Sequence, residues 1–384
     1  MLAMWLGFDD QGERLSLGRK LWEINWGFVL LVILVASVGF SVLYSAAGGD
    51  LDPWASRQMT RFGIGVLLML TVALIDIRVS LRFAYVFYAI SLVLLVAVEL
   101  VGKVGMGAQR WLHLGFIQIQ PSELMKISLI LAMARYFHGL SIEDVGRLRW
   151  LIVPIAMCVA PAALVMKQPD LGTAMMLLSI GGAMLFLVGV RIWKFASVIA
   201  VGLIMLPVAY AKLHDYQRRR IEIFLDPEQD PLGAGYHILQ SKIALGSGGM
   251  FGKGFLQGSQ SHLNFLPEHH TDFIFTMLAE EFGMIGGLVL ITLYVLLLIY
   301  GYAIAFRSRS QYGRLVGLGV TVMLFVYFYV NIAMVSGLLP VVGIPLPLLS
   351  YGGTAMMTLM MGFGLLLSVY VHRDIDIPRR IGGI

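Results

Sequence analysis

Long apolar runs separated by short polar connections are the dominant pattern of the sequence. A helix needs about 20 mostly apolar residues to span a bilayer, and ten runs approach that length. We therefore predict an all-α polytopic membrane protein, because a helix satisfies its own backbone hydrogen bonds in lipid. The ten transmembrane helices are expected near residues 27–47, 59–77, 81–102, 122–138, 150–166, 171–190, 193–212, 272–305, 313–337 and 350–371.

The remaining polar segments define the predicted topology. We expect one membrane domain over residues 1–384, with tails at 1–26 and 372–384 and a large loop at 213–271 between helices seven and eight. The short loops on one side hold most of the lysines and arginines, which is typical of cytoplasmic loops. Both termini are therefore predicted to be cytoplasmic, and the large loop is predicted to lie on the outer face.

Composition supports a membrane protein and excludes several other classes. The 384 residues are 58% hydrophobic and only 13% charged, against about 25% charged in soluble domains, and the mean hydropathy is +0.82. The net charge of +5 does not indicate a nucleic-acid partner, because the basic residues lie in short loops and no aromatic-basic platform is visible. Cys158 is the only cysteine, so no intrachain disulfide can form.

The segment from Leu266 to Glu281 gathers ionisable residues where the large loop meets the eighth predicted helix. Asp272 is its candidate catalytic base, because ionisable residues at membrane level are often functional. Thr271 is predicted to cap a helix that starts at Asp272, with small residues on the same face leaving room beside the carboxylate. The alternative is that Asp272 is a helix-terminal charge in water.

Other ionisable residues of this segment suggest further roles. His262, His269, His270 and Asp272 could contact a divalent cation, although their spacing matches no closed metal site. Glu280 and Glu281 are adjacent and point in different directions, so we expect them to pair with basic loop residues instead of forming a dyad.

Two shorter outer segments also carry charges. Glu123 and Lys126 lie three residues apart at the start of a predicted helix and can pair on one face; they are either an interfacial ion pair or part of a functional site. Arg110 is either a headgroup anchor or a substrate contact. Asp170 follows a proline and is predicted to cap a helix, alone or beside a substrate pocket.

The large loop contains a basic cluster, a predicted short helix and a glycine-rich run. Arg218 belongs to the cluster and suits either phosphate or anionic lipid headgroups. Lys242 lies in the predicted helix at 236–245, which is expected to lie on the membrane. The run at 246–254 does not match a phosphate-binding loop, because Ser247 stands where a glycine is needed; we interpret it as a flexible loop.

The segment 331–355 is apolar but contains three prolines, which cannot continue a helix. Non-helical backbone at membrane depth must be buried in protein or line a wet cavity. A re-entrant loop that floors an outer pocket is one interpretation, and a proline-rich outer turn between two spans is the other.

This last segment also carries a family resemblance. The run Pro-Val-Val-Gly-Ile-Pro-Leu-Pro-Leu-Leu-Ser-Tyr-Gly-Gly at 340–353 resembles the signature of the SEDS family (shape, elongation, division and sporulation proteins), in the form of its elongation branch. Gly107-Ala-Gln-Arg-Trp-Leu, Gln120-Pro-Ser-Glu, Gln168-Pro-Asp-Leu-Gly-Thr and Thr271-Asp-Phe-Ile-Phe match in the same order. The resemblance spans nearly all of the chain after Trp26.

The resemblance implies a peptidoglycan glycosyltransferase of the bacterial cytoplasmic membrane that polymerises lipid II on its outer face. It implies a class B penicillin-binding protein transpeptidase as partner, and it places Asp272 on the essential aspartate of the family. The candidate substrate-binding residues are Arg110, Glu123, Lys126, Asp170, Arg218, Lys242, Glu268 and Ser350. Two other functions remain open: a lipid II flippase, and a non-catalytic scaffold for the transpeptidase.

Overall fold

The computed structural model describes residues 16–105, 108–114, 117–211, 215–226, 234–259 and 270–378. The helices are α2 (Leu17–Glu23), α3 (Trp26–Ala46), α4 (Ala55–Leu74), α5 (Ile77–Val101), α6 (Pro121–His138), α7 (Ile142–Val145), α8 (Leu148–Lys167), α9 (Leu171–Val188), α10 (Ile192–Ala211), α11 (Asp215–Leu225), α12 (Ala234–Ser247), α14 (Ile274–Arg307), α15 (Gln311–Val335) and α16 (Gly353–Val371). The strands are β1 (Lys103–Gly105), β2 (Ala108–Leu114) and β3 (Ile117–Ile119).

Eight described helices are long and apolar enough to cross a membrane, namely α3, α4, α5, α8, α9, α14, α15 and α16. The prediction of a helical, multi-pass membrane protein is confirmed. The predicted count of ten is not confirmed. The helix α6 has 18 residues and carries Glu123, Lys126 and Arg135, and the fully described part of α10 is an apolar helix over residues 192–205.

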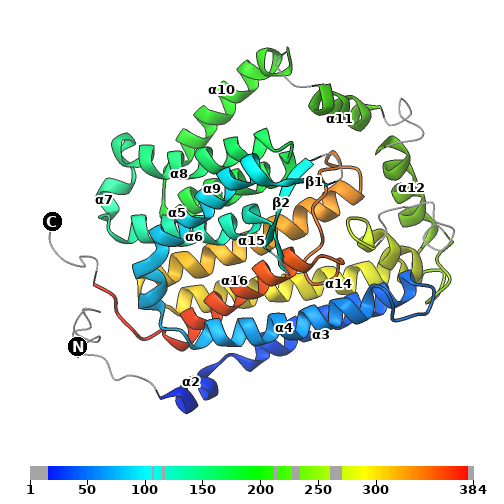
Figure 1. Cartoon of the computed structure of the whole chain (residues 1–384), viewed down its shortest axis with the longest axis horizontal. Coiled ribbons are helices and arrows are strands. Elements are labelled where there is room, and N and C mark those ends of the chain that lie inside the picture. Colours follow the sequence, from blue (N-terminus) through cyan, green and yellow to red (C-terminus); the bar gives the residue numbers. More distant parts are fainter. Residues whose placement is uncertain are drawn as a thin grey trace.

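The helices form a bundle around α14, α15 and α16 (Figure 1). In this view α3 and α4 lie below that trio and α5, α6, α8 and α9 lie above it, while α10 leads away toward α11 and α12. Of the spanning helices, α15 and α16 are the most buried. Glycines permit close approach at these crossings; a Cβ at Gly364 of α16 would lie 2.7 Å from the carbonyl oxygen of Met69 in α4.

The two ends of the described chain meet at one end of the bundle. Lys20 of α2 donates a hydrogen bond to the carbonyl of Leu74 at the end of α4 (2.9 Å). Arg373, just after α16, pairs with Glu23 of α2 (3.4 Å between Nη1 and Oε2). These contacts place the start of α3 and the end of α16 on the same side, as the predicted topology requires.

A small antiparallel sheet, with strand order β1-β2-β3, is an addition to the predicted all-helical fold. Lys103 pairs with Trp111, and Leu112 pairs with Ile119. Little in the sequence indicates this sheet, because β1 and β3 have only three residues each. The sheet matters for function because β2 carries Arg110.

Candidate active site

Asp272 lies in a turn that precedes α14, and not in the first turn of the helix as predicted. Phe273 is the N-cap residue of α14 and makes no side-chain capping hydrogen bond. The predicted cap by Thr271 is wrong, because Phe273 holds the N-cap position. The Thr271 carbonyl accepts a hydrogen bond from the hydroxyl of Ser350 (2.6 Å). Asp272 is partly buried, so it is not a helix-terminal charge surrounded by water.

Further hydrogen bonds fix the backbone of this turn. The amide of Asn331 on α15 donates to the carbonyls of Asp272 (2.9 Å) and Ile344 (2.7 Å). The backbone N–H of Tyr351 donates to the carbonyl of His270 (2.9 Å). Asn331 is fully buried, so its bonds form where competition from water is low. The turn is therefore held from α15 and from the segment that follows it.

The proline-rich segment between α15 and α16 is buried inside the bundle. Leu349 is fully buried and Val342 nearly so. Glycines on two helices admit the segment: a Cβ at Gly39 of α3 would lie 2.7 Å from Leu349 Cα, and one at Gly172 of α9 would lie 2.7 Å from the carbonyl oxygen of Val342. This burial supports the re-entrant loop and contradicts the alternative of an outer turn.

Gly343 leaves open the space in front of Asp272. Its φ of +71° lies in the left-handed region that favours glycine. A Cβ on this residue would lie 3.4 Å from Oδ2 of Asp272. Gly343 is exposed, whereas its neighbours Val342 and Ile344 are buried. The Asp272 carboxylate thus lies beside exposed backbone at Gly343.

The first turns of α14 are packed on all sides, contrary to the prediction that small residues there leave room beside the carboxylate. Thr276 is fully buried, and its hydroxyl lies 2.9 Å from that of Ser241 in α12. The helix then breaks at Gly283, whose φ is 66° and ψ is −164°. The position of Asp272 cannot therefore be estimated from a straight helix.

The glycine-rich loop (246–254) docks at this break. The backbone N–H of Met284 donates to the carbonyl of Gly249 (2.9 Å), and that of Lys253 donates to the carbonyl of Glu280 (3.0 Å). These bonds replace the ones that the helix loses where it breaks. The prediction of a flexible loop is wrong, because this segment anchors the short helical piece that follows Asp272.

Glu280 and Glu281 are almost completely buried. Glu280 pairs with Lys253 (2.6 Å between Oε1 and Nζ) and accepts a hydrogen bond from Ser259 (3.1 Å). Glu281 accepts a hydrogen bond from Ser45 at the end of α3. The predicted pairing with a basic loop residue is confirmed for Glu280, and both carboxylates help to join α14 to its neighbours.

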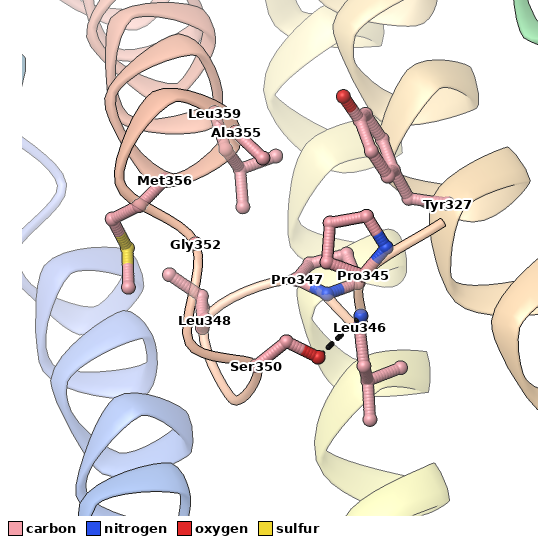
Figure 2. A pocket seen from close by; sticks show the side chains of 10 residues that line it. All are labelled: Tyr327, Pro345, Leu346, Pro347, Leu348, Ser350, Gly352, Ala355, Met356 and Leu359. Atoms are coloured by element: carbon pink, nitrogen blue, oxygen red, sulfur yellow. Dashed lines mark hydrogen bonds between the residues drawn. The ribbon is translucent and has the colours of Figure 1, made fainter. Parts of the chain in front are cut away.

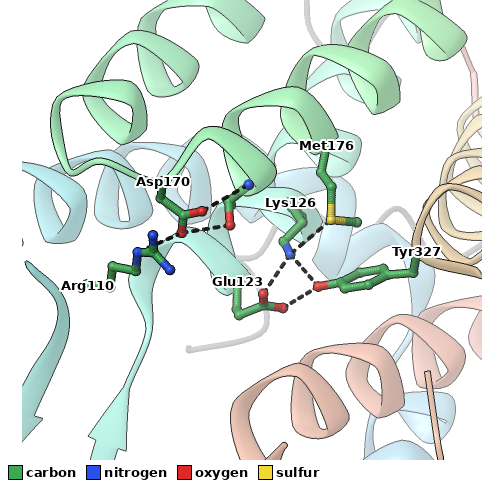
Figure 3. Close-up of polar contacts among 7 residues, drawn as sticks. Arg110, Glu123, Lys126, Asp170, Met176 and Tyr327 are labelled. Atoms are coloured by element: carbon green, nitrogen blue, oxygen red, sulfur yellow. Dashed lines mark hydrogen bonds and ion pairs between the residues drawn. The ribbon is translucent and has the colours of Figure 1, made fainter. Parts of the chain in front are cut away.

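Glu123, Lys126 and Tyr327 form a buried polar cluster (Figure 3). Lys126 Nζ lies 2.6 Å from Glu123 Oε1 and also donates to the hydroxyl of Tyr327. That hydroxyl donates to Glu123 Oε2 (2.5 Å). The predicted ion pair is confirmed, but Lys126 is 1% exposed, so the pair is internal and not interfacial.

Arg110 and Asp170 form a second polar pair beside this cluster (Figure 3). Asp170 caps α9 as predicted, accepting hydrogen bonds from the backbone N–H (3.2 Å) and the hydroxyl (2.9 Å) of Thr173. Arg110 Nε lies 3.5 Å from Asp170 Oδ2, and Arg110 also donates to the carbonyl of Pro169 (2.8 Å). Arg110 therefore ties the small sheet to α9 and does not act as a headgroup anchor.

Two pockets adjoin the proline-rich segment. The first lies between that segment, α15 and α16 (Figure 2), and is lined by Tyr327, Pro345, Leu346, Pro347, Leu348, Ser350, Gly352, Ala355, Met356 and Leu359. Tyr327 thus connects the buried cluster to this pocket. The second is almost wholly apolar and is lined by Gly172, Met175, Met176, Ser179, Val326, Val330, Leu339, Pro340, Val342 and Ile344.

Comparison with known proteins identifies the family of the chain. The model of the FtsW/RodA/SpoVE cell cycle proteins matches residues 22–375. The chain belongs to this family. The peptidoglycan glycosyltransferase MrdB of Escherichia coli strain K12 is 46% identical over 365 residues, which cover 92% of this chain and 96% of MrdB.

Solved structures of FtsW/RodA/SpoVE relatives share the fold. A chain of a peptidoglycan synthase complex, described as coordinating polymerization and crosslinking, is 33% identical with a TM-score of 0.80, covering 92% of this chain and 99% of its own. The rod shape determining protein RodA of Thermus thermophilus is 31% identical with a TM-score of 0.69, covering 92% and 98%. The helical membrane fold expected from the SEDS resemblance is thus confirmed.

The structure brings some of the predicted site residues of this family member together and leaves others apart. Ser350 lies against the Asp272 turn, where its hydroxyl also accepts a hydrogen bond from the N–H of Leu346 (2.7 Å; Figure 2). Arg218 lies on α11 and donates a hydrogen bond to the carbonyl of Tyr210 (3.4 Å). Its guanidinium also lies over the aromatic ring of Tyr210. Its described contacts therefore belong to α10 and not to the turn.

The remaining predictions in the large loop have separate outcomes. Lys242 is exposed on α12, in the predicted helical segment, and its side chain lies against Gly337 after α15. Glu268 lies outside the described residues, as do His262 and His269. Within the described ranges, no group of three or more His, Cys, Asp and Glu residues could hold a metal ion. A divalent cation therefore stays a prediction.

Sequence reasoning missed Asn331, Tyr327 and Gly343 as individual residues of the site. Asn331 offered a signal, because an amide inside an apolar span must find partners for its polar atoms. Tyr327 offered none, since a tyrosine in an apolar helix is ordinary. Gly343 belongs to the family signature, but its left-handed backbone and its place beside Asp272 emerge only in three dimensions.

Proposed function

We propose that this chain polymerises lipid II on the outer face of the cytoplasmic membrane, as a peptidoglycan glycosyltransferase with Asp272 as its general base. The observation that carries the proposal is the place of the Asp272 carboxylate: it lies beside the exposed Gly343, in a turn whose backbone is held by Asn331 and Ser350. Relatives named peptidoglycan glycosyltransferases, at up to 46% identity over nearly the whole chain, support the reaction.

The reaction is a substitution at a sugar carbon. Asp272 takes the proton from the 4-hydroxyl of the acceptor sugar, and the oxygen attacks the anomeric carbon of the donor. The new carbon–oxygen bond forms as the bond from that carbon to the diphosphate breaks, and the polyprenyl diphosphate leaves with the bonding electrons. Attack from the opposite face converts an α-linked donor into a β-linked product. A positioned base contributes about 10²- to 10⁴-fold to such a rate.

A fixed backbone suits this role. The base must lie within hydrogen-bonding reach of the hydroxyl, and misplacement by about 1 Å can cost 100-fold in rate. Hydrogen bonds from Asn331, Ser350 and Tyr351 determine where the turn lies. The side chain of Asp272 remains next to the exposed Gly343. The arrangement combines a rigid support with a carboxylate beside exposed backbone.

The apolar pocket beside Gly343 fits the lipid part of such a substrate. Val342 and Ile344, which flank Gly343, also line this pocket between α9 and α15. Met175 on its rim is exposed on the outside of the bundle, where lipid would surround the protein. A polyprenyl chain can lie there while its sugar reaches the carboxylate, since burial of apolar surface favours binding by about 25 cal/mol per Å².

The proposed cellular setting is the cytoplasmic membrane during elongation, with both termini in the cytoplasm and a class B penicillin-binding protein as partner. The positive charge of the short loops on one side supports this orientation. The ion pair of Glu23 in α2 with Arg373 after α16 puts both ends of the described chain on one side of the bundle, which is consistent with this orientation. Similarity to a chain of a peptidoglycan synthase complex supports a crosslinking partner.

The test is a lipid II polymerisation assay with the purified chain and its transpeptidase partner. Asp272→Asn should reduce glycan formation at least 100-fold, because the amide cannot accept the proton. The variant should keep its thermal stability, since the hydrogen bond from Asn331 goes to the backbone of Asp272. Asp50→Asn is the matched control, because Asp50 is an exposed carboxylate in the connection between α3 and α4.

Full polymerisation by the Asp272→Asn protein would refute the assignment of the base. Lipid II movement across vesicles without polymerisation by the wild type would instead indicate a flippase. A cell that keeps its rod shape with Asp272→Asn would indicate a scaffold that only recruits its partner.

A further inference from the structure

One face of α4 lines the segment that leads into α16. Figure 1 shows α4 beside α16. Trp54, Gln58 and Arg61 lie on this face at intervals of four and three residues. The Trp54 ring stacks on that of His270 at 4.5 Å, and Gln58 donates to the carbonyl of Ser350 (2.8 Å). This face of α4 therefore reaches the same turn that carries the candidate base.

The side chain of Arg61 on that face is held against the segment that leads into α16. Its guanidinium carbon lies 4.7 Å from the centre of the Tyr351 ring, and the N–H of Tyr351 is bonded to the carbonyl of His270. Gly353 leaves room for it, because a Cβ there would lie 3.2 Å from Arg61 Nε. The ring holds the plane of the guanidinium through cation–π contact. Arg61 is partly buried within a candidate span.

Arg61 makes no hydrogen bond or ion pair with the residues that the structure describes; its described contact is the Tyr351 ring. Three other cations of the outer segments are already matched: Arg110 pairs with Asp170, Lys126 with Glu123, and Lys253 with Glu280. A partly buried charge in a membrane span is costly without an anion. A negatively charged group from outside the described residues would offset this cost.

We propose that Arg61 binds the diphosphate of the lipid-linked donor. This inference rests on the proposed function, which supplies a polyprenyl diphosphate as leaving group. A guanidinium can make two parallel hydrogen bonds to a phosphate, and it favours the negative charge that grows as the bond to the sugar breaks. Arg61 lies about two helical turns into α4 from its outer end, on the same face as Gln58, which contacts Ser350 beside the Asp272 turn.

The test measures binding of three probes to the full chain in nanodiscs of zwitterionic lipid: a polyprenyl diphosphate, the monophosphate and the alcohol of the same chain length. The wild type should bind the diphosphate most tightly. Arg61→Gln should weaken that binding about ten- to a hundredfold, as expected for a lost charge-assisted hydrogen-bond pair, and leave binding of the alcohol unchanged. Arg61→Lys should fall between the two, because it keeps the charge but not the planar fork.

Arg57→Gln is the matched control, since Arg57 is exposed one turn earlier on the same helix. Equal binding of the diphosphate by wild type and Arg61→Gln would overturn the proposal. So would an equal loss for diphosphate and alcohol, which indicates a structural role, or full displacement of the diphosphate by phosphatidylglycerol at lipid concentrations, which indicates a headgroup anchor.

The Asp272→Asn protein separates this inference from the proposed function. It should bind the diphosphate as the wild type does while it forms no glycan. Normal binding together with normal polymerisation by Asp272→Asn would remove the proposed base and leave the diphosphate site in place. If Arg61→Gln, but not Asp272→Asn, loses the preference for the diphosphate over the alcohol, the diphosphate site at Arg61 is supported.

Discussion

Asn331 offers the sharpest test of how the fold positions the candidate base. Its amide bridges the carbonyls of Asp272 and Ile344 at 2.9 and 2.7 Å, and the residue is fully buried. Asn331→Leu keeps a side chain of similar size and removes both donated hydrogen bonds. The change touches no group that we assign to chemistry, so any loss of turnover must act through position.

The expected magnitude follows from the two carbonyls that lose their donor. A buried acceptor without a partner costs about 1–3 kcal/mol. Ile344 is buried and should incur that full penalty. Asp272 is only partly buried, so water can solvate its carbonyl in part. We expect a total loss of about 2–4 kcal/mol in the free energy of unfolding, and a fall in kcat of about 100-fold if the turn moves by about 1 Å.

The assay combines lipid II polymerisation per folded molecule with unfolding in detergent. Thr321→Val is the control on the same helix, because the hydroxyl of Thr321 bonds only within α15, to the carbonyl of Gly317 (2.8 Å). It should change stability by about 1 kcal/mol or less and leave kcat intact. Wild-type turnover and stability in Asn331→Leu would refute the view that this bridge positions Asp272.

Three further predictions concern other parts of the structure. Gly343→Ala places a methyl group 3.4 Å from Asp272 Oδ2 at a φ of +71°. It should cost about 1–2 kcal/mol of stability and lower the polymerisation rate about tenfold or more. An unchanged rate would show that substrate does not enter there. Lys126→Met leaves the buried carboxylate of Glu123 without its cation and should lower the free energy of unfolding by about 3–5 kcal/mol. The double variant with Glu123→Gln should recover most of that stability, and equal stability of the single and double variants would contradict this coupling. Burial lowers the pKa of His372 below its usual range, against the raising effect of its bond to the Ser368 carbonyl, so the unfolded chain takes up the proton first as pH falls. The contribution of His372 to stability should be full above about pH 6.5 and decline as pH falls through the lowered pKa. If the Tm of the His372→Gln protein fell with acid as steeply as that of the wild type, this assignment would be contradicted.

The sequence was sufficient for the fold class and for the local chemistry of several residues. Apolar runs predict helices in a membrane because length and hydropathy are properties of each run alone. The cap at Asp170 and the pair of Glu123 with Lys126 depend on neighbours within four residues, so they too were predictable. The family resemblance then predicted Asp272 as the centre of the candidate site.

What could not be predicted depends on contacts between distant segments. The start of α14 was misplaced by two residues because the turn at Asp272 is fixed by Asn331 and Ser350, which no local rule connects to it. The break at Gly283 is satisfied by the glycine-rich loop, so a segment that reads as flexible became an anchor. Arg61 attracted no special notice in the sequence, because only the structure reveals which cations already have partners.

The supports of Asp272 are translated after it, and this has a consequence for biosynthesis. Asn331 follows Asp272 by 59 residues, and Ser350 follows Thr271 by 79. In the proposed orientation, a nascent chain that has inserted α14 already presents the Asp272 carboxylate at the outer face but lacks the residues that orient it. With Asp272 as the proposed base, the enzyme can begin to build cell wall only after its last two helices have entered the membrane, and incomplete chains on the ribosome are expected to be inactive.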